Sequence, residues 1–184
     1  MCVLTEYIST CDDQTASGGA YRVAIVEQAD ITAYTMTSGE VSAMTSANPF
    51  VEIGFISEKG SLGDTFAKNQ DGTGGVWTVN FTAILGALSG TALRYIDNLA
   101  ACGCPFTMAI ETDKGIFLAG LPYKNVTVTG TDISGKGGGV RVTAADAQSG
   151  TAFADASTAS VTLTETRTRA MVETSLTFAA LLAL

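Results

Sequence analysis

The sequence predicts a mainly β protein, a β-sandwich or barrel of antiparallel strands, with one short α-helix at about residues 89–101 and a projecting hairpin arm at about residues 57–75. Thr, Ala, Gly and Ser are the common residues where many proteins use Lys and Glu, and Thr favours strands. The 20 Gly residues against 3 Pro suit many tight turns. A hydrophobic content of 46% with 15% charged residues is typical of a globular chain, and 184 residues fit a single domain spanning residues 1–184.

The central segment, residues 50–120, organises the predicted fold. Residues 50–57 alternate as a strand, and residues 76–85 carry the longest strand signal in the chain. The stretch between them contains two clusters of turn residues, at 58–64 and 69–75, so we expect a flexible arm that projects beyond the sheet. An ordinary surface loop is the alternative that this pattern leaves open.

The helix is predicted from its ends and its apolar face. Ser89 is suited to cap the amino end, and Gly103 followed by Pro105 stops the helix. Residues at helical spacing form one apolar face, namely Leu93, Ile96, Leu99 and Ala100. This is the only helix that the sequence predicts.

The remaining strands are predicted from alternation and turn residues. Residues 30–37 alternate strictly, which places Ile31 and Tyr34 on opposite faces. Residues 125–129 and 140–144 are predicted to pair with each other. Further strands are expected at residues 2–8, 21–27, 39–44, 106–111, 116–120 and 160–165.

The two ends extend the predicted domain. Residues 1–19 form a strand and loop extension. Residues 170–184 form an apolar tail, which is a final strand, a docked tail or a contact with a partner. The tail is too short to span a bilayer, which takes roughly 20 residues, so we expect no membrane insertion. Residues 1–6 lack the basic and apolar regions of a signal peptide, so we expect synthesis and folding in a cytoplasm.

The charge balance narrows the classes of function. The net charge is −8 and the chain has no histidine. Binding of nucleic acid phosphates needs clustered Lys and Arg, which argues against that function. The commonest general base and transition-metal ligand are also missing. The acidic excess either keeps the protein soluble or forms a functional acidic surface, and composition leaves both open.

Two partial motifs carry no predicted chemistry. Residues 130–136 match a phosphate-binding loop, but Gly137 replaces its Ser or Thr and a strand follows where a helix is needed, so we expect a hairpin tip. Four aspartates, Asp12, Asp13, Asp64 and Asp71, lack calcium-loop spacing and are predicted to be solvated loop carboxylates. We therefore expect no enzyme activity, no cofactor and no metal site.

The four cysteines leave three readings open. Cys102-Gly-Cys104 does not match the spacing of zinc ribbons or thioredoxin-like enzymes. Reduced thiols are the default for a chain made in a cytoplasm. A bridge from Cys11 to Cys102 or Cys104 is the alternative, and a metal site that also includes Cys2 is a minor one.

The order of elements resembles one known family. The strand, arm and strand of residues 50–85, the helix of 89–101 and the hairpin of 106–120 resemble the tail-tube proteins of tailed bacteriophages and the related tube protein of type VI secretion. The resemblance covers about residues 20–166. It implies a virion protein, assembled in the host bacterial cytoplasm, that forms hexameric rings stacked into a hollow tail tube. It also implies tape-measure and tail-terminator proteins as partners, and DNA that passes without specific binding.

Within that resemblance, the arm and the ends are predicted to make contacts between copies. The predicted contact residues are Ser57, Glu58, Lys59, Leu62, Phe66, Lys68, Trp77, Phe178 and Leu181. Strands 21–26 and 76–85 are predicted to frame the ring, and an acidic lumen suits the passage of DNA. Two alternatives remain open: a head-decoration or tail-terminator protein of a virion, and a cell-surface β-sandwich binding module.

Overall fold

Two β-sheets form the body of this protein in a computed structural model, which describes residues 20–56, 59–69, 74–87, 89–130, 138–148 and 157–184. The strands of the larger, 8-stranded sheet are, in spatial order, β4 (Val51–Ile53), β1 (Ala20–Glu27), β7 (Phe106–Thr112), β8 (Gly115–Ala119), β12 (Val172–Thr174), β3 (Glu40–Ser46), β2 (Ile31–Thr37) and β9 (Thr127–Thr129). The 4-stranded sheet has the order β10 (Arg141–Gln148), β11 (Thr158–Arg167), β6 (Gly75–Gly86) and β5 (Gly60–Lys68). A short 3-10 turn, η1 (Gln28–Asp30), links β1 to β2.

The main core lies between the two sheets. Buried side chains of β1 and β7 meet those of β6 and β11, with Phe55 packed edge-on against Phe81. The helix α1 (Gly90–Cys102) closes one end, where it packs against β10 and β11. Its buried residues are Ala92, Tyr95, Ile96 and Leu99, and Ser89 Oγ accepts a hydrogen bond from the Ala92 N–H as its cap. These observations confirm the predicted mainly β fold class and the predicted helix.

A second core lies on the opposite face of the larger sheet. It contains Tyr34, Val41 and Leu118 together with the tail residues Phe178 and Leu181. The tail ends in a five-residue helix, α2 (Phe178–Leu182), which the sequence did not predict. Of the three readings of the tail, the structure has two: a final strand, β12, and a docked segment, α2.

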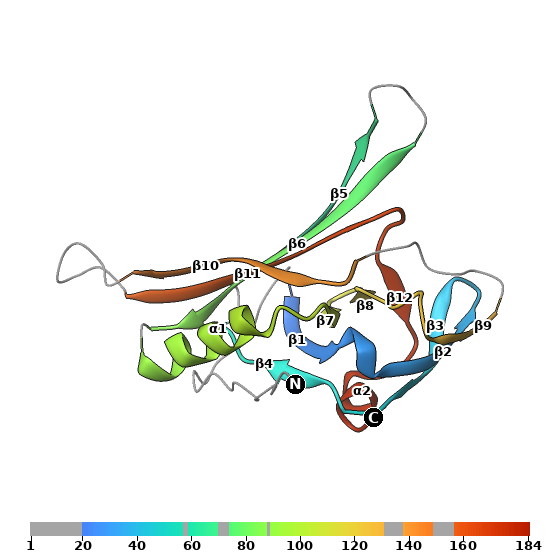
Figure 1. The fold of residues 1–184 in the computed structure, drawn as a ribbon, viewed down its shortest axis with the longest axis horizontal. Coiled ribbons are helices and arrows are strands. Elements are labelled where there is room, and N and C mark those ends of the chain that lie inside the picture. The colour runs from blue at the N-terminus through green and yellow to red at the C-terminus, as the bar shows by residue number, and fades with distance from the viewer. Residues whose placement is uncertain (1–19, 57–58, 70–73, 88, 131–137, 149–156) are drawn as a thin grey trace.

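The arm is an extension of the 4-stranded sheet. Strands β5 and β6 pair antiparallel from Gly60 with Ala83 to Lys68 with Gly75, and Figure 1 shows the hairpin projecting away from both sheets. We call the outer part of this hairpin, Asp64–Lys68 and Gly75–Val79, the arm. The predicted projection is confirmed. The turn cluster predicted at 58–64 was wrong from Gly60 onward, because continuous pairing with β6 holds these glycine-rich residues extended.

Two other predictions on strands were wrong. The strands near 125–129 and 140–144 do not pair: β9 lies parallel to β2 in the larger sheet, whereas β10 pairs with β11 in the other. Strict alternation also fails in β2, because register shifts next to Ile31 and Thr35 bring Ile31, Tyr34 and Met36 all into the second core. Alternation within a strand does not encode its partner or its bulges.

Candidate assembly surface

The outer face of the 4-stranded sheet is a continuous array of hydroxyl side chains. In β6, Val79, Phe81 and Ala83 point into the core, so the alternating residues between them point outward. Because the register is regular, the outward residues of β5 and β11 lie beside those of β6. The outward residues with polar side chains are Ser61, Thr65, Thr78, Asn80, Thr82, Ser160, Thr162, Thr164 and Thr166, and the apolar Ala67, Val76 and Ile84 alternate onto the same face. We call this surface the hydroxyl face.

Hydrogen bonds across the strands order the hydroxyl face. The hydroxyls of Thr82 and Thr162 are 3.1 Å apart, and Thr164 Oγ1 donates to Asn80 Oδ1 at 3.1 Å. Thr143 of β10 joins the same row, 2.9 Å from Thr164 Oγ1. Within the part of these four strands that the structure describes, the charged outward residues, Arg141 and Asp146, belong to β10 at one edge. The face is therefore polar but almost uncharged.

Both edges of this sheet are open within the described residues. Strand β10 pairs with β11 alone and β5 pairs with β6 alone, so each presents one row of backbone N–H and C=O groups to solvent. The strands alternate in direction across the sheet, so β5 and β10 run in opposite senses. Such edges are the backbone groups that a strand of another molecule can pair with.

An aromatic pair stands on the arm. Phe66 and Trp77 are register partners on the outer part of the hairpin, on the face of β5 and β6 that continues the core. Phe66 is 52% exposed and its ring lies against Gly75, where a Cβ would collide with it. The glycine lets the ring lie flat on the backbone, so the arm carries an apolar side chain held in place.

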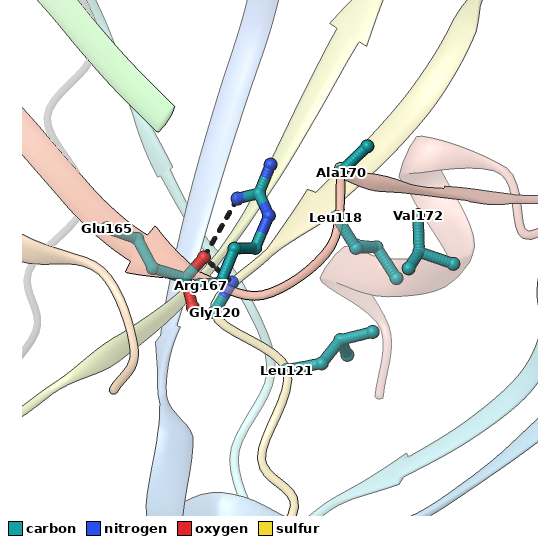
Figure 2. A pocket seen from close by; sticks show the side chains of 7 residues that line it. All are labelled: Leu118, Gly120, Leu121, Glu165, Arg167, Ala170 and Val172. Atoms are coloured by element: carbon teal, nitrogen blue, oxygen red, sulfur yellow. Dashed lines mark hydrogen bonds and ion pairs between the residues drawn. The ribbon is translucent and has the colours of Figure 1, made fainter. Parts of the chain in front are cut away.

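An ionic cluster lies where the arm leaves the body. Arg167 donates from Nη2 to Asp64 Oδ2 at 2.7 Å and from Nη1 to Glu165 Oε2 at 3.0 Å. Figure 2 shows Arg167 directed toward Glu165, which also accepts the Gly120 N–H at 2.7 Å. The adjoining cavity has about 10 Å³, the room that one water molecule needs, so it does not hold a larger ligand.

This cluster was missed in the sequence. Asp64 was predicted to be a solvated loop carboxylate, but its side chain is 14% exposed and ion-paired in β5. Its position, two residues from Leu62 and Phe66 in an alternating strand, places it on the inner face. The same reasoning applies to Glu165 and Arg167, since they follow Leu163 at inward positions. Charged residues at inward positions were the available signal.

The predicted contact residues fall into three groups. Lys59, Phe66 and Lys68 are exposed along β5 or just before it, and Trp77 is half-buried beside Phe66. Leu62 packs against the main core. Phe178 and Leu181 are 3% and 0% exposed and pack within their own chain. Ser57 and Glu58 lie outside the described residues.

Arg22 holds the tail against the larger sheet. Its guanidinium donates to both carboxylate oxygens of Glu52 at 2.8 Å and lies 4.3 Å from the centroid of the Phe178 ring. Glu111 is a longer-range partner at 3.8 Å. The hydrogen bond to Glu52 raises the pKa of Arg22 above its ordinary value, although burial opposes the shift. The tail therefore packs beneath a permanent cation.

The cysteines differ in state. Cys102, at the end of α1, is disulfide-bonded, and Cys104 is a free thiol. The expectation of reduced thiols was wrong for Cys102. Cys2, Cys11, Asp12, Asp13 and Asp71 lie outside the described residues, as do residues 131–137 of the predicted hairpin tip and the extension at 1–19.

Comparisons with protein-family models, with curated proteins and with solved structures found no match to this chain. Among the described residues, no group of three or more Cys, Asp or Glu is placed to hold a metal ion. None of the described helices is long and apolar enough to cross a membrane.

Proposed function

We propose that this chain is a structural virion protein whose copies assemble into rings, stacked as the hollow tail tube of a bacteriophage. The observation that carries this proposal is the 4-stranded sheet with two long open edges. Four antiparallel strands are an even number, so β5 of one copy and β10 of the next are antiparallel when copies are related by rotation about a ring axis. Repetition of that pairing closes a ring and leaves no edge exposed.

The packing within each copy indicates which face of the 4-stranded sheet would line the channel of such a ring. The larger sheet and α1 cover the inner face of the 4-stranded sheet, so its other face, the hydroxyl face, is the free one. A sheet that curves with its bulky side outward places the hydroxyl face toward the central channel. Among the described residues, that wall carries only the charges of Arg141 and Asp146 at its β10 edge, in place of the acidic lumen expected with the family resemblance. It still suits passage of DNA, since it has no lysine or arginine row to retain phosphates.

The arm is the proposed contact between stacked rings. It extends past both sheets, and Phe66 and Trp77 present an ordered apolar pair where the body no longer covers them. Rigid aromatic side chains are common anchors of protein–protein contacts. The family resemblance adds three further parts to the proposal: the six-fold symmetry of the ring, the tape-measure partner and the tail-terminator partner.

Negative-stain electron microscopy of the concentrated full-length protein tests this function. We expect long hollow tubes or stacked rings. Single rings that never stack favour a tail-terminator protein, and binding to preformed capsids without polymerisation favours head decoration. A protein that stays monomeric in sedimentation velocity over a hundredfold range of concentration contradicts the assembly proposal.

A further inference from the structure

The ionic cluster at the base of the arm marks the point where the arm leaves the body. Leu62, two residues before Asp64, packs against the main core, whereas Thr65–Lys68 are exposed. Register places Asp64 beside Val79 of β6 and, one strand further, Glu165 of β11. Asp64 is thus the last residue of β5 whose side chain packs inside the body.

The hydrogen bonds of the cluster join Asp64 to both sheets. Asp64 Oδ2 accepts from Arg167 Nη2 and also from the Met171 N–H at 3.0 Å, in the connection that leads to β12 of the larger sheet. Arg167 Nε donates to the Arg169 carbonyl oxygen, which holds the guanidinium in place. Glu165 accepts the Gly120 N–H next to β8. The side chain of Asp64 is therefore tied to β11 of the 4-stranded sheet and to the connection that leads to β12 of the larger sheet.

The charges in the cluster do not balance. Two carboxylates share one guanidinium, and Asp64 Oδ1 is buried with no hydrogen-bond partner among the described residues. Lys68 lies on the same face of β5 but is exposed nearer the tip, and the Arg169 side chain is exposed as well. Arg167 is the group that neutralises Asp64. Loss of one partner from a buried ion pair leaves the other uncompensated, which strongly destabilises that contact.

We propose that Asp64 and Arg167 are positioning residues for the arm: their ion pair fixes the direction in which β5 and β6 leave the body, and loss of the pair frees the arm while the sandwich stays folded. Beyond Asp64, β5 pairs with β6 alone, and β6 loses its second neighbour, β11, beyond Trp77. The outermost part of the arm is therefore a two-stranded hairpin, which is marginal in water. This ion pair acts within one chain. Its consequence for contacts between rings rests on the proposed function.

The test is hydrogen exchange of the full-length Asp64→Asn variant, kept dilute so that assembly does not contribute. Asn preserves the shape and one acceptor but removes the charge. We expect amides of Thr65–Lys68 and Val76–Thr78 to exchange about tenfold faster or more than in wild type, with β1 and β7 unchanged. The single Trp77 gives a second signal, because its emission should shift to longer wavelength as the arm opens.

Asp113→Asn is the matched control, because it removes the carboxylate of an exposed pair, Lys114–Asp113, from the β7–β8 hairpin. It should leave the exchange of the arm unchanged. The proposal is overturned if the amides of the arm exchange at the wild-type rate in Asp64→Asn. It is also overturned if exchange in β1 and β7 becomes faster by the same factor as in the arm.

If Asp64→Asn fails to fold, wild type supplies a second measurement. In wild type, the protection of backbone amides against hydrogen exchange should fall sharply along β5 just beyond Asp64. Equal protection of all amides from Gly60 to Lys68 would overturn the proposal. Because these readings come from single chains, they are independent of whether tubes form.

Discussion

The rings of Phe66 and Trp77 pack together on the arm, with their centroids 5.3 Å apart and their planes inclined by 46°. The two residues face each other in register on β5 and β6, and Phe66 keeps about half of its surface exposed. The Phe66 ring lies against Trp77 and against the backbone at Gly75. The pair is therefore the first place to test contacts between copies.

Phe66→Ala should weaken assembly while the single chain stays folded. We expect the concentration at which assembly begins to rise by about tenfold or more, as for loss of an interface anchor, with an unchanged circular dichroism spectrum. Sedimentation velocity over a concentration series measures the effect. Leu93→Ala, which trims an exposed leucine of α1, is the control and should assemble like wild type. Equal assembly of both variants argues against a role for the arm.

Two glycines of the same hairpin should respond differently to alanine. At Gly75 an added methyl group meets the Phe66 ring and the Ala67 carbonyl, and we expect a loss of about 1–3 kcal/mol in the free energy of unfolding. At Gly63 no atom lies within 4 Å of the added group, so Gly63→Ala should be neutral or slightly stabilising. Urea unfolding followed by Trp77 fluorescence compares them. Similar losses at both positions would show that the crowding at Gly75 does not matter.

Glu165→Gln should destabilise the whole sandwich. Glu165 is 3% exposed and accepts both the Gly120 N–H and the Arg167 guanidinium, so the neutral amide weakens two buried hydrogen bonds, although Asp64 still compensates Arg167. We expect a loss of about 1.5–3 kcal/mol in the free energy of unfolding, as for loss of a hydrogen bond to a charged group. Urea denaturation gives the free energy of unfolding, and Glu173→Gln on the exposed side of β12 is the control, with little change expected. A loss no larger than that of the control would contradict the buried role of Glu165.

Leu181→Ala tests whether the tail packs on its own chain. The side chain is fully buried in α2, and its loss should cost about 2–5 kcal/mol in the free energy of unfolding. Leu93→Ala is again the control, since that leucine is 43% exposed. If Leu181 instead served mainly as a contact between copies, unfolding of dilute protein would be unaffected and only assembly would suffer.

Arg22→Gln should weaken the docked tail equally at all pH values near neutrality. The folded-state pKa of Arg22 is raised, so its contribution is complete below the unfolded-state value and is lost only in strongly alkaline solution. The side chain is 42% exposed, so we expect a loss of no more than about 1 kcal/mol. Thermal unfolding of variant and wild type between about pH 6 and pH 9 measures it. A difference that changes across this range would point to another titrating group.

Local sequence was sufficient for the elements whose signals are short-range. The Ser89 cap and the stop at Gly103 and Pro105 placed α1 within one residue at each end. Alternation and length identified β6, and the polar composition of residues 57–75 identified a projecting segment. Hydrogen bonds and side-chain contacts between residues close in the chain determine these features.

Only the tertiary structure decided which strands pair and which charged side chains meet in the interior. Nothing local distinguishes β9 beside β2 from β9 beside β10, because pairing depends on contacts far apart in sequence. In the same way, alternation with Leu62 and Phe66 could place Asp64 on the inner face, but only the fold brings Arg167, 103 residues later, to its carboxylate. The sequence by itself determined a β protein with one capped helix and an arm. Long-range packing determined which strands share a sheet, where the open edges lie and what holds the arm in place.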